Sequence, residues 1–115
     1  MATLDKVFKR KKTIWLSYDL GLRGDYSGLY TWLADKGAKE CGDSIAVFKM
    51  NATGDIADTI TNDLKESVKF NSTDRVYIIY KDKDLNKGKF IVGNRKRPPW
   101  DGYGLVDKGV AQEDY

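Results

Sequence analysis

Apolar and polar residues alternate from Thr13 to Leu20, which is the period of a β-strand. Successive side chains of a strand point to opposite faces, so the pattern predicts a strand with two different faces. One face carries Ile14, Leu16, Tyr18 and Leu20, and the other carries Trp15, Ser17 and Asp19. Both faces hold apolar side chains, so we expect this strand to lie inside a sheet.

Two later segments have the spacing of amphipathic helices. The first follows a turn at Gly21–Gly24, with Asp25 as the expected N-cap and Gly37 as its end. Its apolar positions are Tyr26, Leu29, Tyr30 and Leu33. The second opens at Thr53–Asp55, with Thr53 or Asp55 as the cap. Its apolar positions are Ile56, Ile60, Leu64 and Val68.

The remaining apolar runs predict further strands. We expect a short strand over 38–41, a firmer one over 44–50 and the most β-prone one over 75–81. Residues 82–88 are polar and predict a hairpin loop before a last strand over 89–93. From Arg95 onward the chain is irregular and ends in an acidic stretch.

This order of elements predicts an α/β fold of the α+β sandwich type. A ferredoxin-like split β-α-β sheet fits best, with two helices on one face and an extra C-terminal strand. The chain then divides into a basic N-terminal arm (1–12), the domain (13–93) and a basic-to-acidic C-terminal tail (94–115).

In such a fold the second face of the sheet is not covered by helices. Here that face carries apolar side chains, so it needs a partner. A homodimer that packs sheet against sheet is one solution, with Trp15 and Tyr77 in the interface. Alternatively, the segment Arg95–Trp100 folds back and covers the sheet with Trp100. That segment can equally present Trp100 to a protein partner or to a nucleic acid.

Composition removes whole classes of chemistry. The 115 residues are enough for one domain and contain no histidine and a single cysteine, Cys41. Histidine bases, histidine ligands, intrachain disulfides and cysteine zinc sites are therefore excluded. No apolar run approaches the roughly 18 residues of a membrane span, and no secretory signal is visible. We expect a cytoplasmic protein with no membrane partner.

Charge is spread unevenly around a net value of +3. Residues 1–12 and 81–97 are strongly basic, whereas 101–115 is acidic. This predicts a polyanion partner, RNA or DNA. The candidate phosphate-binding residues are Arg10, Lys11, Lys12, Arg23, Arg95, Lys96 and Arg97. The alternative is that the lysines are solvated flanks of strands that prevent edge-to-edge aggregation.

Asp19 and Ser17 are the candidate catalytic residues. A carboxylate at the end of a central strand is poorly explained by packing, and two of them across a dimer axis would repel. A Mg or Mn ion between them would relieve the repulsion and polarise a phosphodiester. Ser17 shares the face and can orient a phosphate or a water. Alternatively, Asp19 accepts backbone N–H bonds from the Gly21–Gly24 turn.

The stretch Ile14–Leu20, with the short turn and the Leu-Tyr-x-x-Leu helix after it, resembles small ferredoxin-like ribonuclease-fold proteins. These include VapD, the antitoxin endoribonuclease GhoS and the small nuclease-like subunit of the CRISPR adaptation complex. Tyr18–Asp19 matches the Tyr-Asp pair of the CRISPR subunit, and Ser44–Phe48 resembles its Ser-Val-Phe strand. The resemblance covers 13–93 and implies that Asp19 holds a divalent metal at a dimer interface.

Together these patterns favour a small nucleic-acid-associated protein of toxin–antitoxin or phage-defence type. If it is an enzyme, we expect a metal-dependent endonuclease acting on RNA or DNA. The alternative is a non-catalytic protein-binding inhibitor, or an antitoxin-like interaction protein, that uses the exposed sheet or Trp100. A dimeric scaffold is a third hypothesis.

Overall fold

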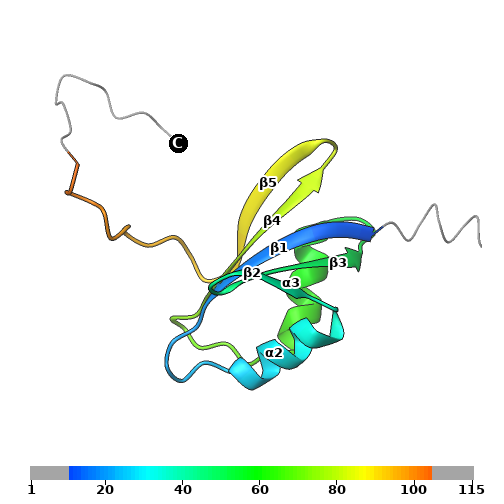
Figure 1. Cartoon of the computed structure of the whole chain (residues 1–115), viewed down its shortest axis with the longest axis horizontal. Helices are drawn as coiled ribbons and strands as arrows, with labels where there is room; N and C mark the ends of the chain where they lie inside the picture. Colours follow the sequence, from blue (N-terminus) through cyan, green and yellow to red (C-terminus); the bar gives the residue numbers. More distant parts are fainter. Residues whose placement is uncertain (1–10, 105–115) are drawn as a thin grey trace, which may run out of the picture.

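A computed structural model describes residues 11–104 and contains an antiparallel sheet with two helices (Figure 1). The elements are β1 (Lys11–Asp19), α2 (Tyr26–Asp35), β2 (Lys39–Gly42), β3 (Ile45–Asn51), α3 (Ile56–Ser67), β4 (Arg75–Asp82) and β5 (Leu85–Val92). The predicted α+β sandwich is confirmed. Within these residues, neither helix has the length and apolar character that crossing a membrane requires.

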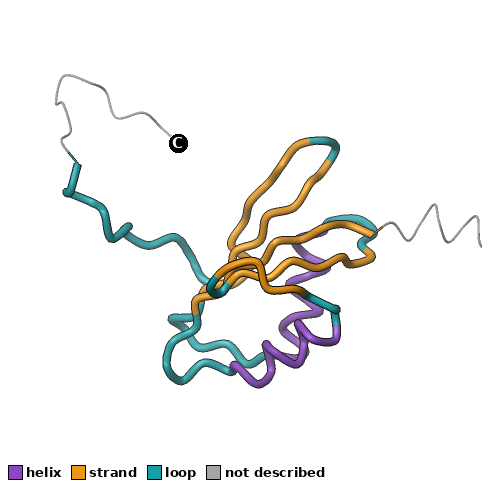
Figure 2. The backbone as a smooth tube through the Cα atoms, in the orientation of Figure 1, coloured by secondary structure: helices purple, strands orange, loops and turns teal. Residues whose placement is uncertain are grey.

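The central strand of the sheet is β1. The strand order is β2-β3-β1-β4-β5, and every neighbouring pair is antiparallel. The chain crosses from β1 to β2 through α2 and from β3 to β4 through α3. Both helices lie below the sheet in Figures 1 and 2, so the two layers are a sheet and a helical pair.

The hydrophobic core lies between the sheet and the helices. The β1 residues Ile14 and Leu16 are fully buried, as the alternation predicts. The stripe of the second helix is also confirmed, because Ile56, Ile60, Leu64 and Val68 are all buried. Burying each such side chain contributes roughly 1.5–3 kcal/mol.

The first helix packs differently from its predicted stripe. Tyr30 is 50% exposed, whereas Trp32, which the stripe omits, is buried. Trp32 stacks edge-on against Phe48 of β3 at 5.3 Å between centroids. Its indole N–H donates to Asp63 Oδ2 on α3 at 2.9 Å. This hydrogen bond between the two helices sets the rotation of α2 about its own axis.

Asp25 caps α2, as predicted, and also connects the two helices. One carboxylate oxygen accepts the Gly28 N–H at 2.9 Å. The other accepts the Lys69 N–H just beyond α3, also at 2.9 Å. These two backbone donors hold the pKa of Asp25 below its ordinary value. On α3 the cap is Asp55, which accepts the Asp58 N–H.

The predicted polar loop over 82–88 is wrong. β4 extends to Asp82 and β5 begins at Leu85, so only Lys83 and Asp84 form the turn. Both have positive φ, 50° and 67°, as a two-residue hairpin turn of the primed type requires. The strand is polar here because the hairpin is exposed on both sides. β1 also begins two residues early, so Lys11 and Lys12 belong to the sheet.

We predict that Asp63→Ala lowers the free energy of unfolding by about 1–3 kcal/mol at pH 7, because it leaves the buried indole N–H of Trp32 unpaired. It also removes the ion pair with Lys36, whose Nζ lies 2.6 Å from Asp63 Oδ2. Urea unfolding measures the effect. Glu66→Ala, at an exposed position of the same helix, is the control and is expected to change stability by less than about 0.5 kcal/mol.

The same variant has a pH signature. Lys36 and Trp32 hold the pKa of Asp63 below its ordinary value. A lowered carboxyl pKa stabilises the fold above the unfolded-state pKa of about 3.9, and this contribution is lost as the pH falls through the folded-state pKa. The stability difference between wild type and Asp63→Ala is therefore expected to shrink below pH 4. An unchanged difference at pH 2.5 would contradict this role of the carboxylate.

Candidate functional site

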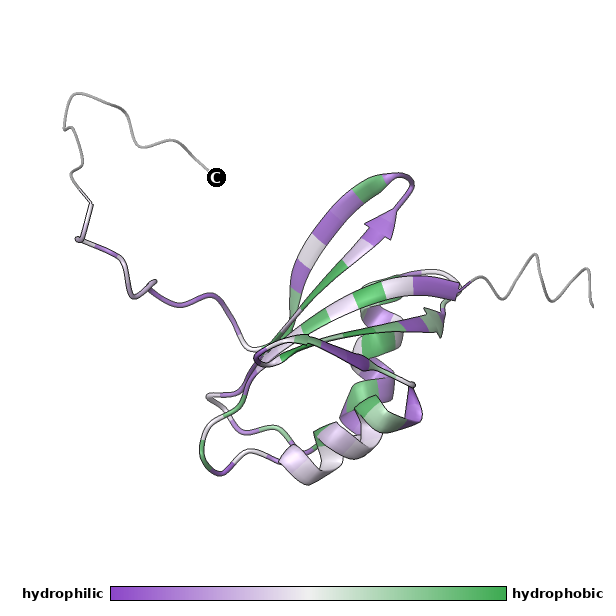
Figure 3. Cartoon of the chain, in the orientation of Figure 1, coloured by the Kyte–Doolittle hydropathy of each residue, from purple (hydrophilic) through white to green (hydrophobic). Residues whose placement is uncertain are grey.

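The side of the sheet away from the helices carries a row of apolar side chains. Trp15 lies at its centre, opposite Val47 of β3 and Ile79 of β4. Trp15 and Ile79 are 42% and 43% exposed. Figure 3 shows apolar stretches along the inner strands and a polar hairpin tip at β4–β5. We call this side the open face.

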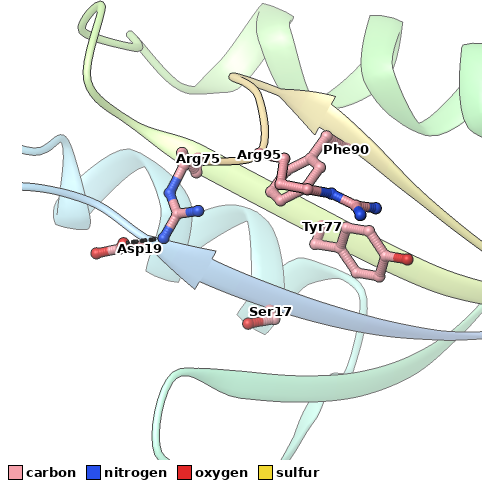
Figure 4. Close-up of a pocket in the computed structure, with 6 residues that line it drawn as sticks. All are labelled: Ser17, Asp19, Arg75, Tyr77, Phe90 and Arg95. Carbon is pink, nitrogen blue, oxygen red and sulfur yellow. Dashed lines mark hydrogen bonds and ion pairs between the residues drawn. The ribbon is translucent and has the colours of Figure 1, made fainter. Parts of the chain in front are cut away.

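A pocket of about 340 Å³ lies on the open face where β1 ends. Figure 4 shows its lining residues, which are Ser17, Asp19, Arg75, Tyr77, Phe90 and Arg95. Asp19 and Arg75 are opposite each other in the sheet, and Arg75 Nη2 donates to Asp19 Oδ2 at 2.8 Å. The pocket therefore brings together four of the residues predicted from the sequence: Ser17, Asp19, Tyr77 and Arg95.

The pocket has more positive than negative charge. Lys96 Nζ lies 4.0 Å from the same Asp19 oxygen that receives Arg75. Arg75, with a smaller contribution from Lys96, holds the pKa of Asp19 below its ordinary value. Asp19 is consequently ionised at neutral pH and neutralised by Arg75, whereas Arg95 and Lys96 leave an excess of positive charge. Such a pocket attracts anions.

The turn hypothesis for Asp19 is wrong, because another carboxylate occupies that role. Asp74, only 1% exposed, accepts the Gly21 N–H at 3.3 Å and the Asn71 N–H at 2.7 Å. It joins the loop after β1 to the loop before β4. The side chain of Asp19 instead faces the open side, where it pairs with Arg75.

One chain's pocket residues do not fit a divalent metal. Such an ion prefers several oxygen ligands, and Asp19 supplies one carboxylate that already accepts a hydrogen bond from Arg75. Among residues 11–104, no three cysteine or acidic side chains gather closely enough to hold a metal ion. The Mg or Mn site implied by the resemblance would need a carboxylate from a second chain.

An aromatic pair forms the floor of the pocket. The rings of Tyr77 and Phe90 meet edge-to-face, with centroids 4.8 Å apart. The Arg75 guanidinium lies 5.8 Å from the Phe90 centroid, within cation–π range. The Tyr77 ring lies across β5 at Gly88, where a Cβ atom would collide with it. This glycine therefore sets where the Tyr77 ring can lie.

The other end of the open face is also basic. A groove of about 680 Å³ extends from Trp15 to the hairpin tip. Its lysines come from the start of β1 and from the end of β4 with its turn: Lys11, Lys12, Lys81 and Lys83. Asp82 in this groove is paired with Lys87 at 2.9 Å. Cations thus flank Trp15 on one side and the aromatic pair on the other.

The structure does not bring all predicted residues to this face. Arg23 is exposed in the loop after β1 and lines neither site. Arg97 forms an ion pair with Asp101 at 2.6 Å. Trp100 is 73% exposed, and its segment leads away from the sheet (Figure 1), so the hypothesis that Trp100 covers the sheet is wrong. Arg10 lies outside the described residues.

Sequence reasoning missed Arg75 and Phe90. The signal for Arg75 was present, because it shares the alternation of Tyr77 and Ile79 and ends that face of the strand. Phe90 was hidden by an irregularity in the register of β4 and β5 between Val76 and Tyr77. Neither residue stands out without the pairing of β4 with its two neighbours.

No family model, curated protein or solved structure matches the chain. The resemblance over residues 13–93 stays a prediction from the sequence. The function proposed below rests on the geometry and charge of the open face.

We predict that Arg75→Gln raises the pKa of Asp19 toward its ordinary value, because it removes the guanidinium that donates to the carboxylate. Lys96→Gln is expected to raise this pKa less, since its ammonium lies 4.0 Å away. Carboxyl-detected NMR titration of Asp19 measures both changes. A larger effect of Lys96→Gln would show that the ion pair with Arg75 does not dominate.

Proposed function

We propose that this protein binds nucleic acid through the open face of its sheet. One observation carries the proposal: an apolar, aromatic strip is bounded at both ends by cations, and Asp19, the carboxylate in the pocket at one end, is already paired with Arg75. Nucleic acids combine a regularly charged backbone with flat apolar bases. The open face offers a counterpart to both.

The basic residues supply the electrostatic part of the affinity. Arg95 and Lys96 lie at one end of the strip, and Lys11, Lys81 and Lys83 lie at the other. Nine residues of β1 span the distance, which at about 3.4 Å per residue is roughly 27 Å. Cations spaced over this length can contact several phosphates along one backbone.

Charge also distinguishes this partner from a second copy of the chain. A two-fold pairing of the open face with itself would place each basic end against a basic end, whichever way the two sheets are turned. Like charges brought together in an interface oppose association. We therefore propose that the homodimer expected from the sequence does not occupy this face.

The strand order supports a ferredoxin-like arrangement as the finer description of the fold. In the order β2-β3-β1-β4, one helical crossover connects β1 to β2 and a second connects β3 to β4. β5 adds an outer strand beside β4. With both helices drawn on one side (Figure 2), this arrangement leaves the open face for a ligand.

Three narrower hypotheses come from the sequence: cleavage, a toxin–antitoxin or phage-defence role, and a cytoplasmic location. Cleavage would centre on Asp19 and Ser17, which line the pocket together. The protein-binding alternative is favoured by exposed Trp100. A nucleic-acid interface on the open face is compatible with either setting, and it is the claim that the geometry supports best.

We predict that a labelled single-stranded oligonucleotide binds with an affinity that falls steeply between 50 and 200 mM salt, because phosphate neutralisation releases counterions. Arg95→Glu combined with Lys96→Glu is expected to weaken binding at least about tenfold and to flatten the salt dependence. Fluorescence anisotropy measures both. The matched control is Lys65→Glu with Lys69→Glu, which makes the same charge change on the helical side.

If the two double variants weakened oligonucleotide binding equally, the net charge of the protein, and not the open face, would account for the affinity. Absence of binding at low salt would contradict the proposed function and favour a protein partner. Gels of the same mixtures, run with Mg²⁺, Mn²⁺ or EDTA, show whether the oligonucleotide is cut. Asp19→Asn then shows whether Asp19 is required for any cutting.

A further inference from the structure

We propose that the open face selects single-stranded nucleic acid, whose bases stack on Trp15 and on the Tyr77–Phe90 pair. This inference rests on the proposed function and specifies its ligand. The electrostatic argument alone applies equally to duplexes and to single strands. The arrangement of the aromatic rings separates the two.

Trp15 is the first stacking position. It projects from the central strand and is flanked by Val47 and Ile79, yet 42% of it remains exposed. An indole in the middle of a sheet face loses apolar burial if nothing covers it. A flat, uncharged base fits this apolar surface better than a phosphate or an ammonium group does.

The aromatic pair is the second stacking position. Tyr77 is diagonal to Trp15, because Trp15 is opposite Ile79 and Ser17 is opposite Tyr77. Diagonal neighbours on one sheet face lie about 7–8 Å apart, so two bases of one strand can contact the two positions in turn. Because Gly88 has no side chain, the Tyr77 ring can lie across β5 at this position. There the ring packs edge-to-face against Phe90.

Phosphate contacts fit the same path. Arg75 lies against the Phe90 ring while its guanidinium pairs with Asp19, and Arg95 lines the same pocket. A base on Tyr77–Phe90 would bring its phosphate toward this positive end. On the other side, Lys81 and Lys83 lie in the groove that Trp15 lines. Cations therefore flank the aromatic rings at both ends of one strip, and basic grooves with aromatic side chains are typical of surfaces that bind single strands.

A duplex does not fit this strip. Its bases are stacked on one another and present only their edges, so it would lay charged backbone on Trp15 and Ile79. Desolvating phosphates against apolar side chains is unfavourable. Single strands expose the faces of their bases, and stacking of these faces on aromatic rings tolerates any sequence.

The test compares an eight-nucleotide oligothymidylate with a blunt duplex of the same length per strand, by anisotropy at constant salt. Eight nucleotides lie within the range of about 4–16 that small single-strand-binding domains cover. The full-length protein is expected to bind the single strand more tightly. Trp15→Leu and Tyr77→Leu are each expected to weaken this binding about 5- to 100-fold while leaving duplex binding unchanged. Leucine keeps the face apolar.

Tyr30→Leu is the matched control, because Tyr30 is an exposed aromatic on the helical side, 50% exposed against 42% for Trp15. It is expected to leave single-strand binding unchanged. Thermal unfolding of each variant confirms that the fold is intact. Equal affinity for single strand and duplex, with Trp15→Leu and Tyr77→Leu binding like wild type, would overturn the inference while leaving the proposed function standing. If the wild-type protein bound neither the single strand nor the duplex, both this inference and the proposed function would be overturned.

Discussion

Two helices on one side of a five-stranded antiparallel sheet leave the other side without cover. Because β1 is the central strand, the lack of cover on this side affects Trp15 most. A residue at the edge of a sheet can turn toward solvent, but Trp15 has neighbouring strands on both sides. Its indole must therefore lie over the sheet, where it is available to whatever approaches that face. The location of the candidate site follows from this layering.

Electrostatics then restricts what can approach. Asp19 is an exposed carboxylate of the open face, and Arg75 pairs with it across the central strands. With Asp19 neutralised, the charges of Arg95 and Lys96 determine the sign of that end of the face. Asp74, not Asp19, accepts the Gly21 N–H of the loop after β1 and the Asn71 N–H of the loop before β4. The buried carboxylate therefore joins the two loops, while the surface carboxylate pairs with Arg75.

Much of the fold could be predicted from the sequence because alternation and helical spacing are local. The two faces of β1, the stripe of α3 and the cap at Asp25 all follow from side-chain spacing alone. The β5 strand could not be predicted to its full length, because its exposed first half has no apolar face to show a period. Trp32 was missed for another reason. Its burial depends on Asp63, thirty-one residues away, which accepts its N–H.

The candidate site was predicted only in part. Ser17, Asp19 and Tyr77 could be assigned to one face from alternation, and Arg95 was identified from its charge. Their meeting in one pocket depends on the pairing of β1 with β4 and of β4 with β5, which only the structure supplies. The same pairing introduces Arg75 beside Asp19. Within one chain that carboxylate is one side of an ion pair, a role that the sequence did not indicate.

The central claim is that the open face, and not the helical side, contacts nucleic acid. The most direct measurement is amide and indole NMR of isotope-labelled protein during titration with an oligothymidylate. The account predicts that the largest shifts occur at the Trp15 indole N–H and at the amides of Tyr77, Ile79 and Gly88, with α2 and α3 little affected. Shifts concentrated on α2 and α3, with the Trp15 indole unmoved, would contradict it.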